Sequence, residues 1–391
     1  MRPGYKQTEV GVIPEDWEVV PLDGLATILH GYGFQSQYFK PLGSYLLTTP
    51  GHFYETGGFR EVRDKQKFYA GPLPDGYLLS QGDLIVAMTE QADGLLGSAA
   101  FVPSGGGYLH NQRLGKVKVL STDVSISFLY RVFNSKAYRA KVRETAAGTK
   151  VKHTSPAKLL EIPVALPPTK AEQEAIAGAL SDVDGLIETL TQLIAKKRQI
   201  KQGAMQELLT GKKRLPGFSG EWEVKQLGDV LKVRHGKSQH DVAVEGGKYP
   251  ILASGGEIGR SNDYLYNKPS VLIGRKGTID VPQFIDTPFW TIDTLFFTEI
   301  APEADVKFIF YKFNTINWRS YNEASGVPSL NASRIESIEF SCPPLPEQTA
   351  IATILTAMDA EITTLETRLA KTRSLKQGMM HNLLTGRIRL L

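Results

Sequence analysis

EQEAIAGALSDVDGLIETLTQLIAKKRQIKQGAMQELLTGKKRL, residues 172–215, returns as EQTAIATILTAMDAEITTLETRLAKTRSLKQGMMHNLLTGRIRL at residues 347–390. The two copies align without a gap at an offset of 347 − 172 = 175 residues, and both end on Lys-Gln-Gly followed by Leu-Leu-Thr-Gly. Solenoid repeats recur every few tens of residues, so this longer period indicates a duplicated pair of domains rather than an array. Each repeat therefore closes a larger unit.

Both copies have the features of one long helix. Thr169, with Glu172 three residues later, predicts a capping box at the start of the first copy. Gly211 and Gly386 follow Leu-Leu-Thr and predict the helix ends, because glycine adopts the left-handed conformation that terminates helices. A helix of about 40 residues spans roughly 60 Å and needs a partner in water.

The apolar residues of each copy advance by alternating steps of three and four, which is the pattern of a coiled-coil seam. The first half of each copy is acidic and the second half is basic, so antiparallel pairing places opposite charges together and opposes the helix dipoles. We predict an intramolecular antiparallel coiled coil, with the basic halves solvated or paired across it rather than bound to phosphate. The predicted seam residues are Leu180, Val183, Ile187, Leu190, Ile194, Leu355, Met358, Ile362, Leu365 and Leu369.

A second repeat lies outside the helices. Trp17-Glu18-Val19 recurs as Trp222-Glu223-Val224, at an offset of 222 − 17 = 205 residues. The segment before each helix is therefore duplicated too, and its first copy is longer by 205 − 175 = 30 residues. Aromatic and β-branched runs between Gly, Pro, Asn and Asp predict irregular β structure, with short amphipathic helices at residues 128–133 and 308–313. The order of the strands does not follow from the sequence.

These patterns predict an α+β fold. Two globular mixed α/β domains occupy residues 1–153 and 215–329, and two helical regions occupy residues 154–214 and 330–391. Antiparallel pairing of the helices would relate the domains by an approximate two-fold axis and set them at opposite ends of a rod. The length of 391 residues agrees with two or three domains.

Composition limits the class of protein. The chain has no long apolar run and no apolar signal-peptide core at its N-terminus, so we expect a cytoplasmic protein without a membrane span. The single cysteine, Cys342, excludes an internal disulfide, and no Cys/His cluster predicts a zinc site. A net charge of +4 permits an anionic partner without requiring one.

Motifs for catalysis are missing. The sequence has no Gly-x-Gly-x-x-Gly, no Gly-x4-Gly-Lys-Ser/Thr and no Asn/Asp-Pro-Pro-Tyr/Phe element, so no nucleotide or methyl-donor site is predicted. Glu223-Val224-Lys225 resembles a nuclease triplet but lacks an acidic partner, and Trp222 makes it more typical of a strand start. We expect a binding and spacing protein that holds no metal and no cofactor of its own.

Side chains suited to base edges gather in the loops of both globular segments. His110-Asn111-Gln112-Arg113 contains the amides and guanidinium that pair bidentately with adenine and guanine. Lysines and arginines near the returns to the helices suit phosphates. Each such residue taken alone is also typical of ordinary surface. The predicted DNA-binding residues are Thr89, Gln91, Asn111, Gln112, Arg113, Lys150, Lys152, His235, Lys237, Gln239, Ser254, Gly256, Arg275, Lys276 and Arg334.

The combination of motifs resembles a known family over the whole chain. Two Trp-Glu-Val tripeptides, two Pro-Pro segments leading into Glu-Gln, and two Lys-Gln-Gly…Leu-Leu-Thr-Gly helix ends are similar to the specificity (S) subunits of type I restriction-modification systems. In that family two target-recognition domains alternate with two helical regions in an organisation that looks circular. Pro14-Glu15-Asp16-Trp17 and Ser219-Gly220-Glu221-Trp222 are equivalent in this way.

The resemblance implies a function. Each domain would recognise one half of a bipartite, non-palindromic site in double-stranded DNA, and the coiled coil would fix the gap. The helices would dock two methyltransferase (M) subunits, and restriction (R) subunits would join them. S-adenosylmethionine, ATP and Mg²⁺ are expected on those partners, which leaves this chain a non-catalytic subunit.

Two alternatives remain open. The chain could be the recognition portion of a fused restriction-methylation enzyme, although its length leaves no room for a methyltransferase. It could also be a coiled-coil interaction scaffold, or a recognition module of another defence system, without catalysis of its own.

Overall fold

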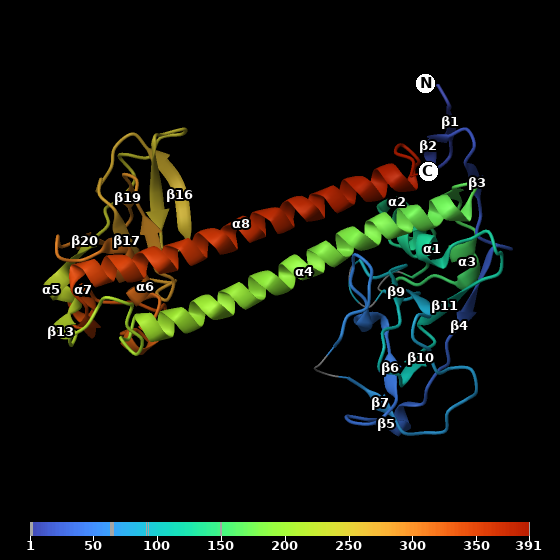
Figure 1. The fold of residues 1–391 in the computed structure, drawn as a ribbon, viewed down its shortest axis with the longest axis horizontal. Coiled ribbons are helices and arrows are strands. Elements are labelled where there is room, and N and C mark those ends of the chain that lie inside the picture. The colour runs from blue at the N-terminus through green and yellow to red at the C-terminus, as the bar shows by residue number, and fades with distance from the viewer. Residues whose placement is uncertain (1–2, 63–65, 91, 93, 149–150, 391) are drawn as a thin grey trace. The chain divides into compact units, whose positions relative to one another are not determined.

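The computed structural model describes residues 3–62, 66–90, 92, 94–148 and 151–390. The chain forms two compact units. The first unit contains Met1–Glu188 together with Ala370–Leu391, and the second contains Thr189–Leu369. Two long helices, α4 (Lys170–Leu208) and α8 (Leu345–Leu384), each contribute one part to both units, and Figure 1 traces them. No described helix is both long enough and apolar enough to cross a membrane.

The first unit is built mainly from two four-stranded sheets. One is antiparallel, in the order β4-β11-β8-β9, and the other has the order β10-β6-β7-β5 with β10 parallel to β6. Two antiparallel pairs, β1-β2 and β12-β3, complete it. Its elements are β1 (Tyr5–Thr8), β2 (Gly11–Pro14), β3 (Glu18–Val20), β4 (Ala26–His30), η1 (Ser36–Tyr38), β5 (Phe39–Lys40), β6 (Leu46–Thr48), η2 (Pro50–His52), β7 (Phe68–Tyr69), β8 (Leu84–Ala87), β9 (Ala99–Phe101), β10 (Tyr108–His110), β11 (Leu114–Val119), α1 (Ile126–Phe133), α2 (Lys136–Thr145), α3 (Pro156–Leu160) and β12 (Val164–Leu166).

The second unit repeats this plan. Its antiparallel sheet has the order β14-β20-β17-β18, its mixed sheet has the order β16-β15-β19 with β15 parallel to β19, and β13 pairs with β21. Strand pairing thus shows the duplication of the domain interiors, where the sequences have diverged. The elements are β13 (Glu223–Gln226), α5 (Leu227–Val230), β14 (Leu231–His235), β15 (Tyr249–Ala253), β16 (Gly256–Ser261), β17 (Ser270–Gly274), β18 (Gln283–Ile285), β19 (Trp290–Thr291), β20 (Leu295–Ile300), α6 (Val306–Phe313), η3 (Trp318–Tyr321), α7 (Ala332–Glu336) and β21 (Glu339–Cys342).

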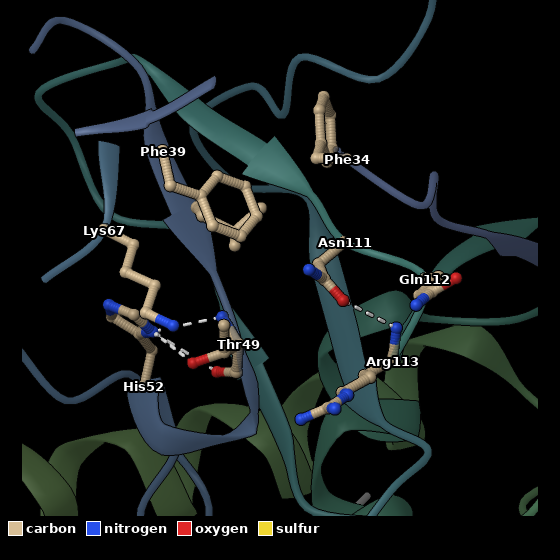
Figure 2. A pocket seen from close by; sticks show the side chains of 9 residues that line it. Phe34, Phe39, Thr49, His52, Lys67, Asn111, Gln112 and Arg113 are labelled. Atoms are coloured by element: carbon tan, nitrogen blue, oxygen red, sulfur yellow. Dashed lines mark hydrogen bonds between the residues drawn. The ribbon is translucent and has the colours of Figure 1, made fainter. Parts of the chain in front are cut away.

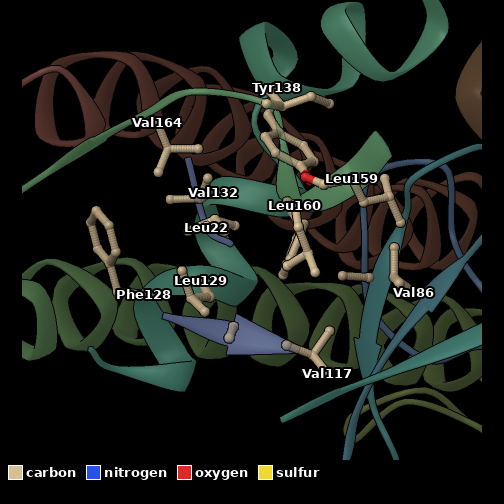
Figure 3. Packing of buried hydrophobic residues seen from close by; sticks show 14 of the residues in the cluster. Leu22, Val86, Val117, Phe128, Leu129, Val132, Tyr138, Leu159, Leu160 and Val164 are labelled. Carbon is tan, nitrogen blue, oxygen red and sulfur yellow. The ribbon is translucent and has the colours of Figure 1, made fainter. Parts of the chain in front are cut away.

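The core of the first unit joins the sheet to both long helices. Phe128, Leu129 and Val132 of α1 pack with Leu159 and Leu160 of α3, as Figure 3 shows. Ile176 and Leu180 of α4 and Leu383 of α8 belong to the same buried cluster. In the second unit the corresponding cluster contains residues from α6 and α7, from the end of α4 and from the start of α8. The helix ends are therefore part of the two domain cores.

Within each unit, the parts of α4 and α8 run antiparallel, as predicted. In the second unit Arg198 pairs with Glu366 at 2.5 Å and Lys201 pairs with Asp359 at 2.5 Å, so partners on α8 come earlier as α4 advances. In the first unit Asp184 pairs with Lys376 at 2.6 Å. The seam residues predicted from the heptad steps are all buried or half-buried. The left-handed backbone of Gly211 (φ 72°) and Gly386 (φ 64°) confirms both predicted helix ends.

The Glu-Gln pair at the start of each long helix has two separate structural roles. Gln173 Oε1 accepts the backbone N–H of Ser125 (2.9 Å), and Ser125 in turn caps α1. Gln348 Oε1 accepts the backbone N–H of Asp305 (2.9 Å), which caps α6 in the same way. Each glutamine therefore fixes a long helix to the short helix of its own domain.

The glutamates bind arginines from the segments that follow the other helix. Glu347 is 1% exposed and accepts hydrogen bonds of 2.6 Å from Nε and Nη2 of Arg214. In the first unit Arg389 binds the 3% exposed Glu172 and also Asp16. The expected capping box is thus half wrong: Thr169 Oγ1 does accept the Glu172 N–H (3.2 Å), but the carboxylate turns to Arg389, because a buried charge needs a cation.

Candidate functional site

Two glycines hold the candidate loops against the antiparallel sheets. At Gly31, directly after β4, an added Cβ would lie 2.0 Å from the backbone oxygen of Asn111. At Gly236, directly after β14, an added Cβ would lie 2.0 Å from the backbone oxygen of Ile292. Only glycine permits such an approach. Residues 111–113 and 292–294 are therefore equivalent loops, each placed at the end of an equivalent strand.

The loop of the first unit presents two of its predicted base-reading side chains. Gln112 and Arg113 are exposed. Asn111 is only 8% exposed, and its Oδ1 accepts the backbone N–H of Arg113 (3.0 Å), so this residue also shapes the loop.

His110 directly precedes these residues in the sequence, but its side chain is buried and has a structural role. It is 2% exposed, and its Nε2 lies 3.0 Å from the backbone oxygen of Leu114. Burial lowers the pKa of His110 to about 4, because the cationic ring would lose its hydration. The ring is therefore neutral near pH 7 and unavailable at the surface.

The loop at residues 88–90 lies beside the loop at residues 111–113 and beside the segment at residues 152–153. Thr89 forms a β-bridge with His153, and the Glu90 N–H donates to the backbone oxygen of Lys152 (2.8 Å). The Met88 N–H donates to the backbone oxygen of Arg113 (2.9 Å). The fold therefore brings together Thr89, which is half-buried, with the exposed Arg113 and Lys152. Two other predicted residues, Gln91 and Lys150, lie outside the described residues.

In the second unit four predicted residues converge in the same way. The backbone N–H groups of Arg275 and Lys276 donate to the oxygen of Thr294 (2.8 and 3.2 Å), and the Lys237 N–H donates to the oxygen of Thr291 (2.8 Å). The Ser254 hydroxyl lies 3.5 Å from the position of a Cβ on Gly277. Lys237 and Lys276 are exposed, whereas Ser254 and Arg275 are half-buried.

Four predicted residues of the second unit occupy other positions. His235 ends β14 and packs edge-on against the Phe296 ring, with centroids 4.9 Å apart. The backbone oxygen of Gln239 accepts N–H groups from the turn that follows it. Gly256 begins β16 with φ 116°. Arg334 lies on α7 with its guanidinium 5.9 Å from the centre of the Tyr321 ring.

A cavity of about 300 Å³ opens beside the first loop. Figure 2 shows the rings of Phe34 and Phe39 above it, Lys67 and His52 on one flank, and Gln112 and Arg113 on the other. The sequence predicted only the 111–113 side of this site. No local motif marks the other lining residues, because they come from separate parts of the chain: Phe34, β5, β6, the region of η2, and Lys67 just before β7. No group of three or more His, Cys, Asp or Glu placed to hold a metal occurs among the described residues.

The model of the type I restriction modification DNA specificity domain matches residues 14–199 and again 219–372. The chain belongs to this family. This specificity chain is 27% identical over 433 residues to a Methanocaldococcus jannaschii protein described as the type I restriction enzyme MjaX specificity subunit. The alignment covers 98% of this chain and 96% of that one. It is 26% identical over 211 residues to the EcoBI specificity subunit of Escherichia coli, covering 51% and 40% of the two chains.

Solved structures agree on the fold of the specificity chain. The crystal structure of a type I restriction-modification S subunit from M. genitalium has a TM-score of 0.67 at 17% identity, covering 98% of this chain and 99% of that one. A structure that describes assembly and conformational transition of a type I system has a TM-score of 0.56 at 15% identity, covering 96% and 99%. At these identities the likeness concerns the fold alone.

Proposed function

We propose that this specificity subunit recognises a bipartite, non-palindromic site in double-stranded DNA, with one unit for each half. The observation that carries the proposal is the pair of equivalent loops after Gly31 and Gly236. The fold holds both loops in the same way, but one carries Asn-Gln-Arg at residues 111–113 and the other carries Ile-Asp-Thr at residues 292–294. Two loops with the same backbone setting but different side chains would recognise two different half-sites.

The catalytic steps would belong to partner subunits. The chain supplies recognition, while S-adenosylmethionine, ATP and Mg²⁺ would bind to methyltransferase and restriction subunits in the cytoplasm. One surface in each unit supports docking of one methyltransferase subunit. Ile200 in the second unit and Leu375 in the first are equivalent residues, at 375 − 200 = 175, and are 47% and 58% exposed.

Glycines three residues further along each helix support the same surface. Apart from the backbone of its own helix, no described residue lies within 4 Å of a Cβ added at Gly203 or Gly378. Glycine inside a helix costs about 1 kcal/mol relative to alanine. Because no contact with another described element requires a glycine at either position, we infer that each leaves room for the close approach of a partner.

The test is to co-express the chain with its methyltransferase partner and map methylated adenines across a genome. A split motif of two unlike halves is expected. Replacing residues 215–329 with the corresponding segment of another family member should change one half only. A continuous or palindromic motif, or a change in both halves, would contradict the proposal.

A further inference from the structure

We propose that the cavity of the first unit holds one nucleobase turned out of the DNA stack, a role that rests on the DNA recognition proposed above. The cavity borders the loop at residues 111–113, so DNA contacting Gln112 and Arg113 would lie at its opening. Its volume of about 300 Å³ is at the lower end of the range for small-molecule sites. One base fits such a space without a larger ligand.

The apolar walls suit the face of a base. Phe34 and Phe39 line the cavity with Leu47. Both rings are held by Tyr69: its ring centroid lies 4.9 Å from that of Phe34 and 6.3 Å from that of Phe39. Aromatic side chains stack on any base, because every base has a π-face. A rigid aromatic wall binds such a ligand with little loss of side-chain entropy.

The polar lining is rich in hydrogen-bond donors. His52 is 4% exposed, and its Nδ1 lies 3.1 Å from the backbone nitrogen of Thr49 and 3.3 Å from its backbone oxygen. In the tautomer that accepts the Thr49 N–H, the proton is on Nε2 and can be donated to a ligand. That Nε2 is buried without a partner among the described residues. Burial lowers the pKa of His52, because the cationic ring would lose its hydration, and this favours the neutral ring. Asn111, whose oxygen is engaged by Arg113, directs its amide nitrogen away from that residue (Figure 2).

These donors favour one class of base. Lys67 and Arg113 add cations to the lining, which suit carbonyl oxygens or the adjacent phosphate. Guanine and thymine present carbonyl acceptors, whereas adenine presents an amino donor on the same edge. We therefore infer that the cavity binds an extruded guanine or thymine. The second unit has Ile292, Asp293 and Thr294 in place of the 111–113 side chains, so its half-site serves as an internal control.

The experiment uses the complex of this chain with its methyltransferase partner, bound to duplex DNA that carries the mapped site. Chloroacetaldehyde modifies unpaired adenine and cytosine, so it marks the base left opposite an extruded thymine or guanine. Methyltransferases also extrude their target adenine, and permanganate marks the thymine left opposite it. Beyond the base pairs of the target adenines, we expect one position that reacts with chloroacetaldehyde. It should lie in the half-site bound by the first unit.

Substitutions then test whether the chloroacetaldehyde-reactive position depends on the cavity. Phe39→Ala should abolish the extra reactivity and weaken binding about ten-fold, because it removes a stacking surface. Tyr54→Ala, an exposed aromatic residue of the same unit outside the cavity, should change neither. A mismatch at the marked pair should tighten binding by the wild-type chain several-fold, because the cost of unpairing is already met, and should not help Phe39→Ala.

The possible failures are distinguishable. The complex could methylate a split motif while no base pair except those of the target adenines reacts with chloroacetaldehyde. In that case the cavity holds no base, although the DNA-recognition role stands. Equal mismatch effects in wild type and Phe39→Ala would overturn the inference in the same way. If no split motif appears, the proposed function itself fails before the cavity is tested.

Discussion

Arg214 and Arg389 each neutralise a carboxylate that the fold buries at the start of a long helix. The guanidinium of Arg214 lies 5.4 Å from the centre of the Trp222 ring, and that of Arg389 lies 5.8 Å from the centre of the Trp17 ring. The repeated tryptophans of the sequence are therefore parts of two equivalent junctions. Both sets of residues lie within the sequence repeats, but their pairing could not be predicted, because it joins residues up to 373 positions apart.

Removing one of these arginines should strongly destabilise its unit. Arg214→Met leaves the carboxylate of Glu347 buried without a cation, which typically costs about 3–5 kcal/mol. The double variant Arg214→Met/Glu347→Gln should recover part of this loss. Urea unfolding measures both, with Arg260→Met as the control, because its partner Glu257 is exposed and the loss should stay below about 1 kcal/mol. Equal losses for Arg214→Met and Arg260→Met would contradict the role of the junction.

His110 makes the stability of the first unit depend on pH. Its folded pKa of about 4 lies below the usual value of 6.5, so the unfolded chain binds the proton more readily. Stability is therefore complete above about pH 6.5 and is lost as the pH falls toward 4, by about 2 kcal/mol between pH 7 and pH 5.

The matched variant is His110→Gln, which keeps an N–H for the Leu114 oxygen but does not titrate. Urea unfolding at pH 7 and pH 5, with hydrogen exchange in β11 reporting the first unit, should show a smaller loss for the variant. The buried His52 contributes in the same direction, so some dependence remains. An unchanged dependence in His110→Gln would exclude His110 as its source.

At the scale of elements, the long helices were predictable and the strands were not. Heptad steps and the split of charge extend over a whole helix, so both the pairing and its direction follow from the sequence. The strands are short, and β6 pairs with β10 across residues 47 and 109. Such pairing depends on tertiary contacts, which leave no local pattern. The cavity residues Phe34, Phe39 and Lys67 escaped prediction for that reason.

The glycine after β14 gives a test of the loop framework. Gly236→Ala should displace the loop at residues 292–294, because its Cβ would meet the Ile292 oxygen at 2.0 Å. Recognition of one half-site should weaken by ten-fold or more, while the other half is read normally, as methylation mapping would show. Gly259→Ala is the matched control, since its Cβ would have an ordinary contact of 3.9 Å. Loss of both halves would indicate general unfolding instead.

At the scale of the whole molecule, duplication gives each unit its own helix surface. Ile200→Asp and Leu375→Asp should each remove one methyltransferase subunit from the purified complex, and the double variant should remove both. A charge placed in an apolar contact is not compensated there. Native mass spectrometry counts the subunits, and Leu120→Asp, at an exposed leucine that belongs to neither long helix, serves as the control. Retention of both subunits in the double variant would show that docking occurs elsewhere.

The division of the chain also bears on its synthesis. The second unit is one continuous stretch, Thr189–Leu369, whereas the first needs Ala370–Leu391 to join residues made at the beginning. Trp17, Ile176 and Leu180 bury their apolar surface in a cluster that includes Leu383. The second unit can therefore complete its core from one continuous stretch that ends within α8. The core of the first unit also needs the end of α8, so a premature stop codon in the last turns of that helix would leave apolar surface of the first unit exposed to chaperones and proteases.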